Sequence, residues 1–593
     1  MPETGVTQAA EVIVDGDEIS EELYGQLSEV RVELSVGAAG WFQLRFSSEE
    51  PLPAAFAIGK RVEISFDDTS GSAKKVFVGA IDGLAVEYDR TARVLVVSGY
   101  DNRRKIGTDP QVRAFTNQSY SDVLRAIASD AGLSAQIDSA ASEPTFEHLM
   151  QVGSNIEFVH RITTRLGMEW LVDGTTMIVR PRERGSTIEL EFGEDLRRFN
   201  ARYTSREHPE TVEVHGWDPA SKQAIVTSET SAQTSPAGDV TIESSSRSRS
   251  REGRTARTWA HPIVSESDGE AIAKGYARRM ASGDLVGRGE TTGNPALVPG
   301  VLCDVDGIDE NWNGTYYVTS AEHVFRSNEP YHTRFTVGAY DSSSLVDLLG
   351  AGPGAAHRPT FGNGVTIGVV TNNRNTEKNY GQVKVRFPYL DDGVESAWAR
   401  VATIGAGPDR GVMFMPEVDD EVLVAFEHGD VTRPYVIGAV WNGRDVPPLA
   451  RHNDDEAMKK RTIVSKLGHT MTFYDGDADD KKNVSIELAD GATKLFLGHD
   501  KIEVIANDGK PIEIKNDKAR LVLAANGDIT LAGENITISA KKDLKIDGNQ
   551  VQSSSKANTK VEAQGQLQLT SNGPAKLQSS AITEVKGSMV KVN

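Results

Sequence analysis

Cysteine is almost absent from this chain, because Cys303 in the string VLCDV is the only one among 593 residues. An intrachain disulfide is therefore excluded, and the apolar neighbours of Cys303 predict a buried thiol on a strand. The sequence also lacks a run of about 18 apolar residues, so it predicts no transmembrane helix. Its amino terminus has neither a basic start nor an apolar run of about 7–15 residues and does not predict a secretory signal.

Motifs of common catalytic and metal sites are missing as well. Neither an H-E-x-x-H pair nor a G-x-S-x-G elbow occurs. The string DGDADD at 475–480 matches the first ligand positions of a calcium loop, but Asp480 and Ile486 stand where Gly and Glu are expected, which favours a solvated turn. The acid pairs Asp391–Asp392 and Asp419–Asp420 lie on predicted turns, where solvated carboxylates are commoner than the acids of glycoside hydrolysis. We therefore predict no catalytic residue, no metal and no cofactor.

Basic residues are scarce in most of the chain. The net charge is −21, with 48 basic and 72 acidic residues before Lys481, and 16 basic and 13 acidic residues from there onward. An acidic body argues against general nucleic-acid binding. The Ser-, Thr- and Arg-rich stretch 229–257 has no periodicity, which indicates a mobile loop. We interpret it as a solvated insertion rather than as a binding site for nucleic acid or an acidic surface. Its arginines are Arg247, Arg249, Arg251, Arg254 and Arg257.

Aromatic residues almost vanish after Lys481, where Phe496 is the only one. Short apolar strands recur there about every eight positions, and each offers two apolar side chains on one face. One chain cannot bury them, whereas identical copies wound around a shared axis can. We predict an intertwined, trimeric triangular β-helix (a β-prism) that forms a rigid needle; a solvated tail would lack the even spacing. The predicted trimer core comprises Leu521, Leu523, Ile529, Leu531, Ile536, Ile538, Leu544, Ile546, Val561, Leu569, Leu577 and Val585.

Strands with period-two alternation dominate the rest of the chain, which predicts a mainly β fold with three helices, at 119–132, 154–167 and 267–282. Five or six short strands before the needle are typical of an OB-type barrel, with Trp398, Phe414 and Phe426 in its core. The predicted segments are 1–100 (first β-barrel module), 101–350 (second module, with the helices and the loop 229–257), 351–364 (linker), 365–443 (OB-fold barrel), 444–483 (polar connector) and 484–593 (needle).

The strings GVVTNNRNTEKNYGQVKVRFPYL and WARVATIGAGPDRGVMFMPEVDDEVLVAFEHGDVTRPYVIGAVWNG closely resemble the base OB domain of VgrG-type spike proteins and phage baseplate spikes. In physical terms, Pro416 and Pro434 are expected to fix strand entry, Asp430 with Arg433 to pin a loop, and the glycines to permit tight turns. Those glycines are Gly411, Gly429 and Gly438. The motif as a whole comprises Gly381, Phe387, Pro388, Gly411, Pro416, Glu421, Gly429, Asp430, Pro434 and Gly438.

The preceding half resembles the hub domain of the same family, which is related to phage tail protein D. The strings that carry this resemblance are FTNQSYSDVLRAIASDAGL, QVGSNIEFVHRITTRLGMEWLVDG and VEVHGWDP. The resemblance implies a homotrimer in which two barrel-like modules per chain present a pseudo-sixfold ring to a hexameric inner tube. It implies a structural hub and membrane-puncturing spike of a contractile injection system, which is type VI secretion-like, extracellular or a phage tail, and which contacts baseplate proteins and a target cell envelope.

The sequence departs from some relatives. Only about 40 polar residues stand where certain phage spikes carry a lysozyme domain, and the chain stops at KVN, so neither a muramidase nor a carboxy-terminal toxin domain is expected. Without an H-x-H string, and with His499 as its last histidine, the chain is not expected to hold a tip iron. The family then implies a separate PAAR-type tip protein. We expect cytoplasmic assembly into a particle that is ejected from the cell.

Two alternatives from other classes remain. A trimeric β-helical tailspike enzyme would cleave surface polysaccharide, but such enzymes expose rows of aromatics and acids, which this needle lacks. A passive adhesin would bind cells without any tube or sheath.

Overall fold

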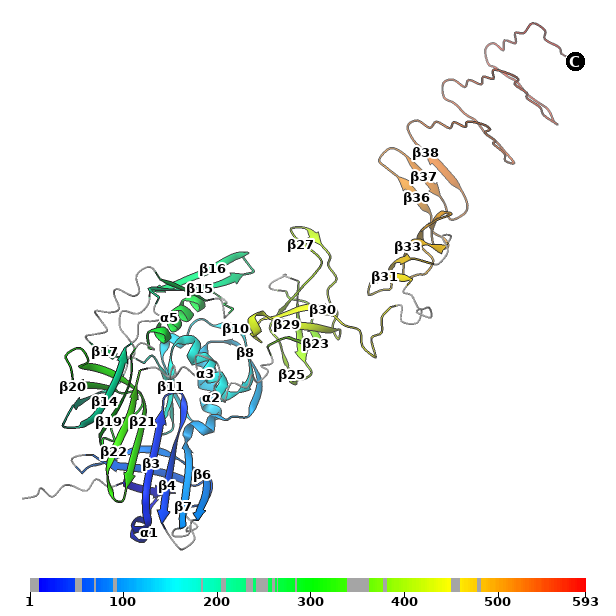
Figure 1. The fold of residues 1–593 in the computed structure, drawn as a ribbon. Helices are drawn as coiled ribbons and strands as arrows, with labels where there is room; N and C mark the ends of the chain where they lie inside the picture. The colour runs from blue at the N-terminus through cyan, green and yellow to red at the C-terminus, as the bar shows by residue number, and fades with distance from the viewer. Residues whose placement is uncertain are drawn as a thin grey trace, which may run out of the picture. The chain divides into compact units, whose positions relative to one another are not determined.

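The computed structural model describes most of the chain, in two compact units, Met1–Val446 and Pro447–Asn593. The chain is mainly β, as the sequence predicts (Figure 1). Among the residues that the structure describes, no helix has the length and apolar character needed to cross a membrane. The described residues are 10–47, 56–68, 71–88, 93–182, 185–203, 209–230, 238–240, 254–258, 262–263, 265–282, 285–338, 362–376, 381–448, 459–476 and 481–592.

A large, mostly antiparallel sheet builds the hub. Its strands alternate between buried and half-buried positions, as in β4, where Phe42, Leu44 and Phe46 face the core. The strands of the first part are β1 (Ala10–Val14), β2 (Asp17–Glu18), β3 (Leu27–Ser35), β4 (Ala38–Ser47), β5 (Arg61–Asp67), β6 (Ala73–Tyr88) and β7 (Arg93–Asp101), with the short helix α1 (Glu21–Gln26) before β3. Those of the second part are β13 (Thr187–Glu191), β14 (Leu196–Tyr203), β17 (Gly238–Val240), β19 (Leu285–Thr292), β20 (Leu302–Asp306), β21 (Gly314–Arg326) and β22 (Glu329–Val337).

The two parts of the hub share this sheet, because β3 pairs with β21 over seven positions from Glu29 to Ser35. Each part still has its own hydrophobic core, one around Phe42 and Phe66 and the other around Tyr316 and Phe335. The sheet therefore crosses the division predicted near Asp101, and Tyr331 of the second part packs in the core around Phe42 and Phe66. Cys303 lies on β20 with no exposed surface, as predicted.

Helices α2 (Tyr120–Asp130) and α3 (Asn155–Leu166) form where the sequence predicts them. Capping boxes start both, Ser119 with Asp122 and Ser154 with Glu157, and Gly167 ends α3 in the left-handed conformation. Their apolar faces share a core with Trp170. Around them lie β8 (Pro110–Gln118), β9 (Ser134–Ile137), β10 (Phe146–Ser154), β11 (Glu169–Asp173), β12 (Thr176–Arg180), η1 (Asn102–Ile106) and η2 (Ser139–Ala141).

The third predicted helix is α5 (Glu266–Ser282), which packs on the hairpin of β15 (Thr211–Asp218) and β16 (Gln223–Thr230). The predicted loop 229–257 is only partly described, and Arg247, Arg249 and Arg251 lie outside the described residues. Its last residues are not loop, because β18 (Thr255–Thr258) pairs in parallel with β15. There Arg257 Nε donates to Glu213 Oε2 at 2.8 Å.

The small barrel closes on itself, since its first strand β23 pairs with both β29 and β24. Its strands are β23 (Val365–Asn372), β24 (Gln382–Phe387), β25 (Asp391–Glu395), β26 (Ala399–Val401), β29 (Glu421–Phe426) and β30 (Pro434–Ala439), with η3 (Glu427–Gly429) between the last two. Gly411 ends the short hairpin of β27 (Ala406–Gly407) and β28 (Arg410–Gly411), and residues 412–420 after it are not strand. Phe426 belongs to the core as predicted, but Phe414 is 61% exposed and Trp398 is half-buried.

The second unit begins with a five-stranded antiparallel sheet and continues with a three-stranded one. Their strands are β31 (Lys460–Val464), β32 (Thr470–Tyr474), β33 (Asn483–Glu487), β34 (Lys494–Gly498), β35 (Ile502–Ile505), β36 (Ile512–Lys515), β37 (Arg520–Leu523) and β38 (Ile529–Ala532). Two of them, β31 and β32, fall inside the range predicted as a polar connector, so the sheet starts before residue 484. Within each sheet, consecutive strands pair antiparallel, and the turns after β33 and β37 hold Gly491 and Gly527 at positive φ.

Candidate functional site

The five-stranded sheet of the second unit has one apolar face. Paired residues in an antiparallel ladder point to the same side, as do residues two apart on one strand. Ile463, Met471 and Ile486 therefore share a face, and all residues on this face are apolar except Arg461. The opposite face carries Thr462, Thr472, Ser485, Phe496 and Glu503 in one cross-strand row. The apolar side chains are Ile463, Met471, Phe473, Val484, Ile486, Leu495, Leu497, Ile502 and Val504.

The three-stranded sheet repeats this arrangement. Leu521 pairs with Leu531 and Leu523 with Ile529, so the register brings four predicted core residues onto one face. Ile512 and Ile514 of β36 complete that face, although the sequence reasoning missed them. Their signal was present in the string IEIK, which alternates like a strand with one apolar side. In the single chain Ile529 is 71% exposed, so this apolar face has no cover within its own chain.

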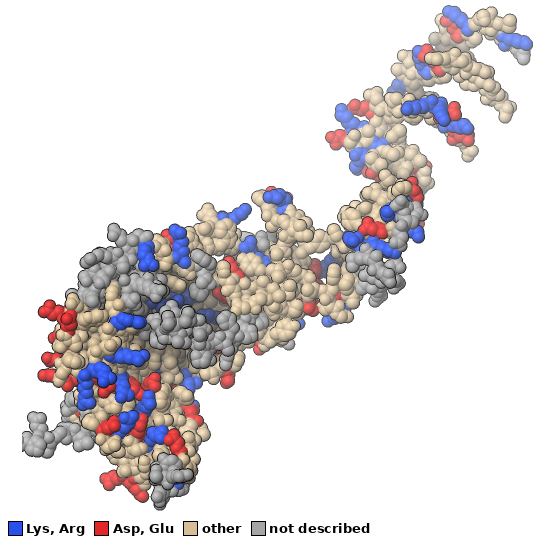
Figure 2. Space-filling model, viewed as in Figure 1, with Lys and Arg blue, Asp and Glu red and all other residues tan. Residues whose placement is uncertain are grey.

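The remaining predicted core residues lie beyond β38. The described residues from 533 to 592 form neither helix nor strand, and their backbone makes no hydrogen bond with other backbone groups. Tan residues, neither basic nor acidic, dominate this unit in Figure 2, with both charges interspersed. All eight predicted side chains are exposed in the single chain: Ile536, Ile538, Leu544, Ile546, Val561, Leu569, Leu577 and Val585.

The barrel motif places most of its residues at turns or in the core. Gly381 and Gly429 have positive φ of 65° and 77°, and a Cβ on Gly411 would lie 2.3 Å from the Gly405 carbonyl oxygen. Phe387 packs on Phe426 in the core, and Pro388 follows it at the surface. Pro416 and Pro434 are buried, and Pro434 opens β30. Glu421 Oε2 accepts from Asn442 Nδ2 at 2.9 Å. Gly438 differs from the expectation, since it lies inside β30 rather than in a turn.

The loop expected to be pinned by Asp430 with Arg433 is held differently. Asp430 Oδ1 accepts from the Thr432 backbone N–H at 2.9 Å and from its hydroxyl at 2.6 Å. The Arg433 guanidinium instead donates to the Ile263 carbonyl oxygen at 3.1 Å and so ties the barrel to the hub. Arg433 bonds Asp430 through its backbone, because the Arg433 N–H donates to the Asp430 carbonyl oxygen at 2.9 Å.

A second contact joins the hub and the barrel through the two-stranded sheet of β8 and β10. Met150 is 1% exposed and belongs to the barrel core, with Val112 and Val152 packed beside it. On the same sheet, His148 Nε2 lies 3.1 Å from the Glu395 carbonyl oxygen. The hub therefore supplies part of the apolar contents of the barrel, and the two form one packed unit.

The candidate acidic sites have structural roles where they are described. Asp391 Oδ1 accepts from the Gly393 N–H at 2.6 Å, and Asp420 Oδ2 accepts from the Glu417 N–H at 2.8 Å. Asp475 pairs with Arg461 at 2.5 Å, while Asp477 and Asp479 of the calcium-like string lie outside the described residues. Among described residues, no group of three acids, histidines or cysteines could hold a metal ion.

Comparison with known proteins gives two family matches. Residues 7–327, more than half of the chain, match the Alg8 N-terminal domain. Residues 366–441 match the type VI secretion system/phage-baseplate injector OB domain, which agrees with the closed barrel at that position.

Curated relatives include two type VI secretion system spike proteins. VgrG1b of Pseudomonas aeruginosa is 32% identical over 227 residues, covering 36% of this chain and 28% of that protein. VgrG3 of Vibrio cholerae is 28% identical over 228 residues, covering 36% of this chain and 22% of that protein. The chain thus spans about a quarter of the length of these relatives.

Solved structures that match the chain include a 43 kDa tail protein of prophage MuSo2 from Shewanella oneidensis, with 15% identity and a TM-score of 0.42 over 56% of this chain and 98% of that one. The Escherichia coli protein c3393, a type VI secretion component, has 15% identity and a TM-score of 0.45 over 70% of this chain and 97% of that one. The injector OB-domain match and the spike-protein relatives confirm the resemblance to VgrG-type baseplate spikes, and the match over residues 7–327 shows that the chain belongs to the family of the Alg8 N-terminal domain.

Proposed function

We propose that three copies of this chain form the hub and the membrane-puncturing spike at the tip of a contractile injection tube. The observation that carries this proposal is the uncovered apolar face on each of the two sheets of the second unit. Each aliphatic side chain gains about 1.5–3 kcal/mol when it is fully buried, so such a face favours association with identical faces. Three copies around an axis give every copy the same environment.

The carboxy-terminal segment supports an intertwined arrangement. The backbone groups of its described residues make no hydrogen bond with other backbone groups of the chain, and its apolar ribs are exposed. Winding with two other chains would pair the backbone groups and bury the ribs, without free sheet edges. A needle of this kind carries axial load, which a spike requires when a sheath contracts.

The hub supports the role of an adaptor between symmetries. Each chain contributes two cores on one continuous sheet. Three chains would thus contribute six such units, which suits a hexameric inner tube. At the far end of the needle, a PAAR-type tip protein would complete the point, and baseplate proteins would hold the hub. The whole assembly would form in the cytoplasm and leave the cell as part of the particle.

We infer a mechanical rather than catalytic role, because the matched relatives are named as spike proteins. One further relative, 26% identical over 198 residues, is named an actin cross-linking toxin, and that activity is said of that protein alone.

The proposed position at the tube tip is tested by purifying contractile particles from cells that make this chain and locating the chain with a labelled antibody. Label at the tip of the inner tube is expected; label along the sheath, or its absence from the particles, would contradict the proposal.

A further inference from the structure

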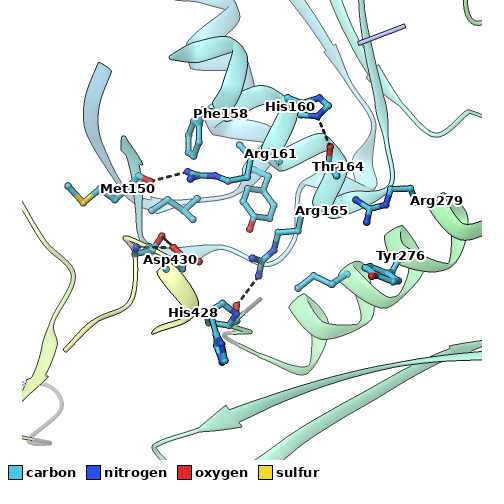
Figure 3. A pocket seen from close by; sticks show the side chains of 17 residues that line it. Met150, Phe158, His160, Arg161, Thr164, Arg165, Tyr276, Arg279, His428 and Asp430 are labelled. Carbon is cyan, nitrogen blue, oxygen red and sulfur yellow. Dashed lines mark hydrogen bonds between the residues drawn. The ribbon is translucent and has the colours of Figure 1, made fainter. Parts of the chain in front are cut away.

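A pocket of about 400 Å³ lies where the hub meets the barrel (Figure 3). Helix α3, helix α5 and the loop that follows β29 line it together. Part of its wall is apolar, with Leu149, Phe158, Ile272 and Tyr276. A pocket of this size and mixed character is typical of sites for small molecules.

Arg161 is one of three arginines that line this pocket. A guanidinium has five N–H groups, and the only hydrogen bond of Arg161 among the described residues runs from Nη2 to the Met150 carbonyl oxygen at 3.3 Å. One face of the guanidinium is covered by the Phe158 ring, 4.7 Å from Cζ to the ring centroid. Surrounding protein atoms desolvate this group and lower the pKa of Arg161, against the opposing effect of Asp430.

Two neighbouring groups add donors without acceptors. Arg165 bonds the Pro262 carbonyl oxygen at 3.0 Å and Asp268 at 2.9 Å through Nη2, but its buried Nε has no partner. The Tyr120 hydroxyl makes no hydrogen bond among the described residues, and burial raises the pKa of Tyr120, so this group stays a neutral donor.

Negatively charged acceptors are scarce in the same wall. Among the described residues that line the pocket, Asp430 is the one carboxylate, and its Oδ1 already accepts two hydrogen bonds from Thr432. Three arginines line the pocket, whereas the chain as a whole carries a net charge of −21. The buried Nε of Arg165 lacks an acceptor, which costs about 1–3 kcal/mol, and the exposed Arg161 side chain carries further N–H groups, so this wall is complementary to a negatively charged acceptor.

We propose that this pocket binds a small organic anion, a carboxylate or a phosphate carried on an apolar body. The planar guanidinium of Arg161 suits either group, because both accept two parallel N–H bonds. The apolar body would lie against Phe158 and Ile272. Such a ligand would contact α3 and α5 of the hub and η3 of the barrel at once, so its binding would strengthen the junction between them.

The experiment is isothermal titration of the full-length protein with three probes of similar size: benzoate, phenyl phosphate and uncharged benzamide. Binding of benzoate, of phenyl phosphate or of both is expected, with a higher temperature of hub unfolding in the presence of the bound probe. The stronger of the two identifies the anion as carboxylate or phosphate. Benzamide is expected to bind at least tenfold more weakly, since it carries no charge.

Variants assign the binding to this pocket. Arg161→Gln is expected to lower the affinity for the anion at least tenfold. Tyr120→Phe, made separately, is expected to lower it a few-fold. Arg125→Gln is the matched control, because this arginine on α2 is half-exposed and does not line the pocket. Absence of binding by both anions, equal binding of benzamide, or unchanged affinity in Arg161→Gln would each overturn the proposal.

Discussion

Leu521 of β37 lies directly opposite Leu531 of β38, and both side chains belong to the uncovered apolar face of the three-stranded sheet. Thr530, next to Leu531, points to the other face and pairs with Val522. Substitutions at Leu531 and at Thr530 therefore distinguish the effect of disturbing the apolar face from the effect of adding a charge to the strand.

Leu531→Asp is expected to prevent assembly of the trimer. The substitution removes about 1.5–3 kcal/mol of burial per chain and brings three carboxylates toward one axis. Thr530→Asp, the control, is expected to leave the trimer intact. Sedimentation velocity measures both; a Leu531→Asp protein that sediments and melts like the unmodified trimer would count against the apolar face as the interface.

Hydrogen exchange is expected to show protected amides between residues 536 and 592 in the assembled protein. These amides have no backbone partner in the single chain, so protection can arise only from other copies. The Leu531→Asp protein should lose that protection. Exchange of the same segment within seconds in the assembled protein would show that the needle is not intertwined there.

Met150→Ala is expected to cost about 2–5 kcal/mol of stability in the hub and barrel, because the side chain fills the barrel core from the hub side. Ile58→Ala is the control, since Ile58 is 67% exposed and its truncation leaves no cavity. Denaturant unfolding of the two variants gives the difference. A Met150→Ala protein as stable as Ile58→Ala would mean that the hub does not contribute to the barrel core.

Acid is expected to destabilise the hub through His323. Burial lowers the pKa of His323 to about 3, and its Nδ1 lies 2.7 Å from the Tyr331 hydroxyl, with Phe66 stacked on the ring. The folded hub therefore excludes a proton that the unfolded chain binds below about pH 6.5. This contribution is full above that pH and is lost toward pH 3, at up to about 1.4 kcal/mol per pH unit.

The measurement is the free energy of hub unfolding between pH 7 and pH 4 in three proteins, at intervals of about one pH unit chosen to span the expected slope. His323→Gln is expected to lose this part of the slope, whereas the control His215→Gln, on the half-exposed face of β15, keeps it. Equal slopes in all three proteins would rule out His323 as the source.

Local signals explain why parts of the fold could be predicted from the sequence. Helices α2 and α3 have serine caps with an acid three residues later, and α3 also has a terminal glycine. In the needle, the alternation in LVL at 521–523 and ITL at 529–531 already indicates which side chains share a face. The pairing of β3 with β21 has no such signal, because nearly three hundred residues separate the two strands. The same holds for Arg433, whose partner Ile263 is far away in the chain.

The sequence also could not predict which aromatic side chains of the barrel are exposed to solvent. Phe414 stands in an apolar string like Phe426, yet the first is exposed and the second buried, because the hairpin at 406–411 leads the chain away from the barrel core. The pocket could not be predicted from the sequence for a related reason. Tyr120, Ile272 and Asp430 meet there from three distant segments, and no spacing in the sequence marks them as neighbours.

The mass of the purified full-length protein tests threefold assembly most directly. Mass photometry at nanomolar concentration is expected to give one particle of about three times the 64.2 kDa of the single chain. A well-folded population at 64.2 kDa alone would contradict the account, because the apolar faces of the second unit would then remain in water.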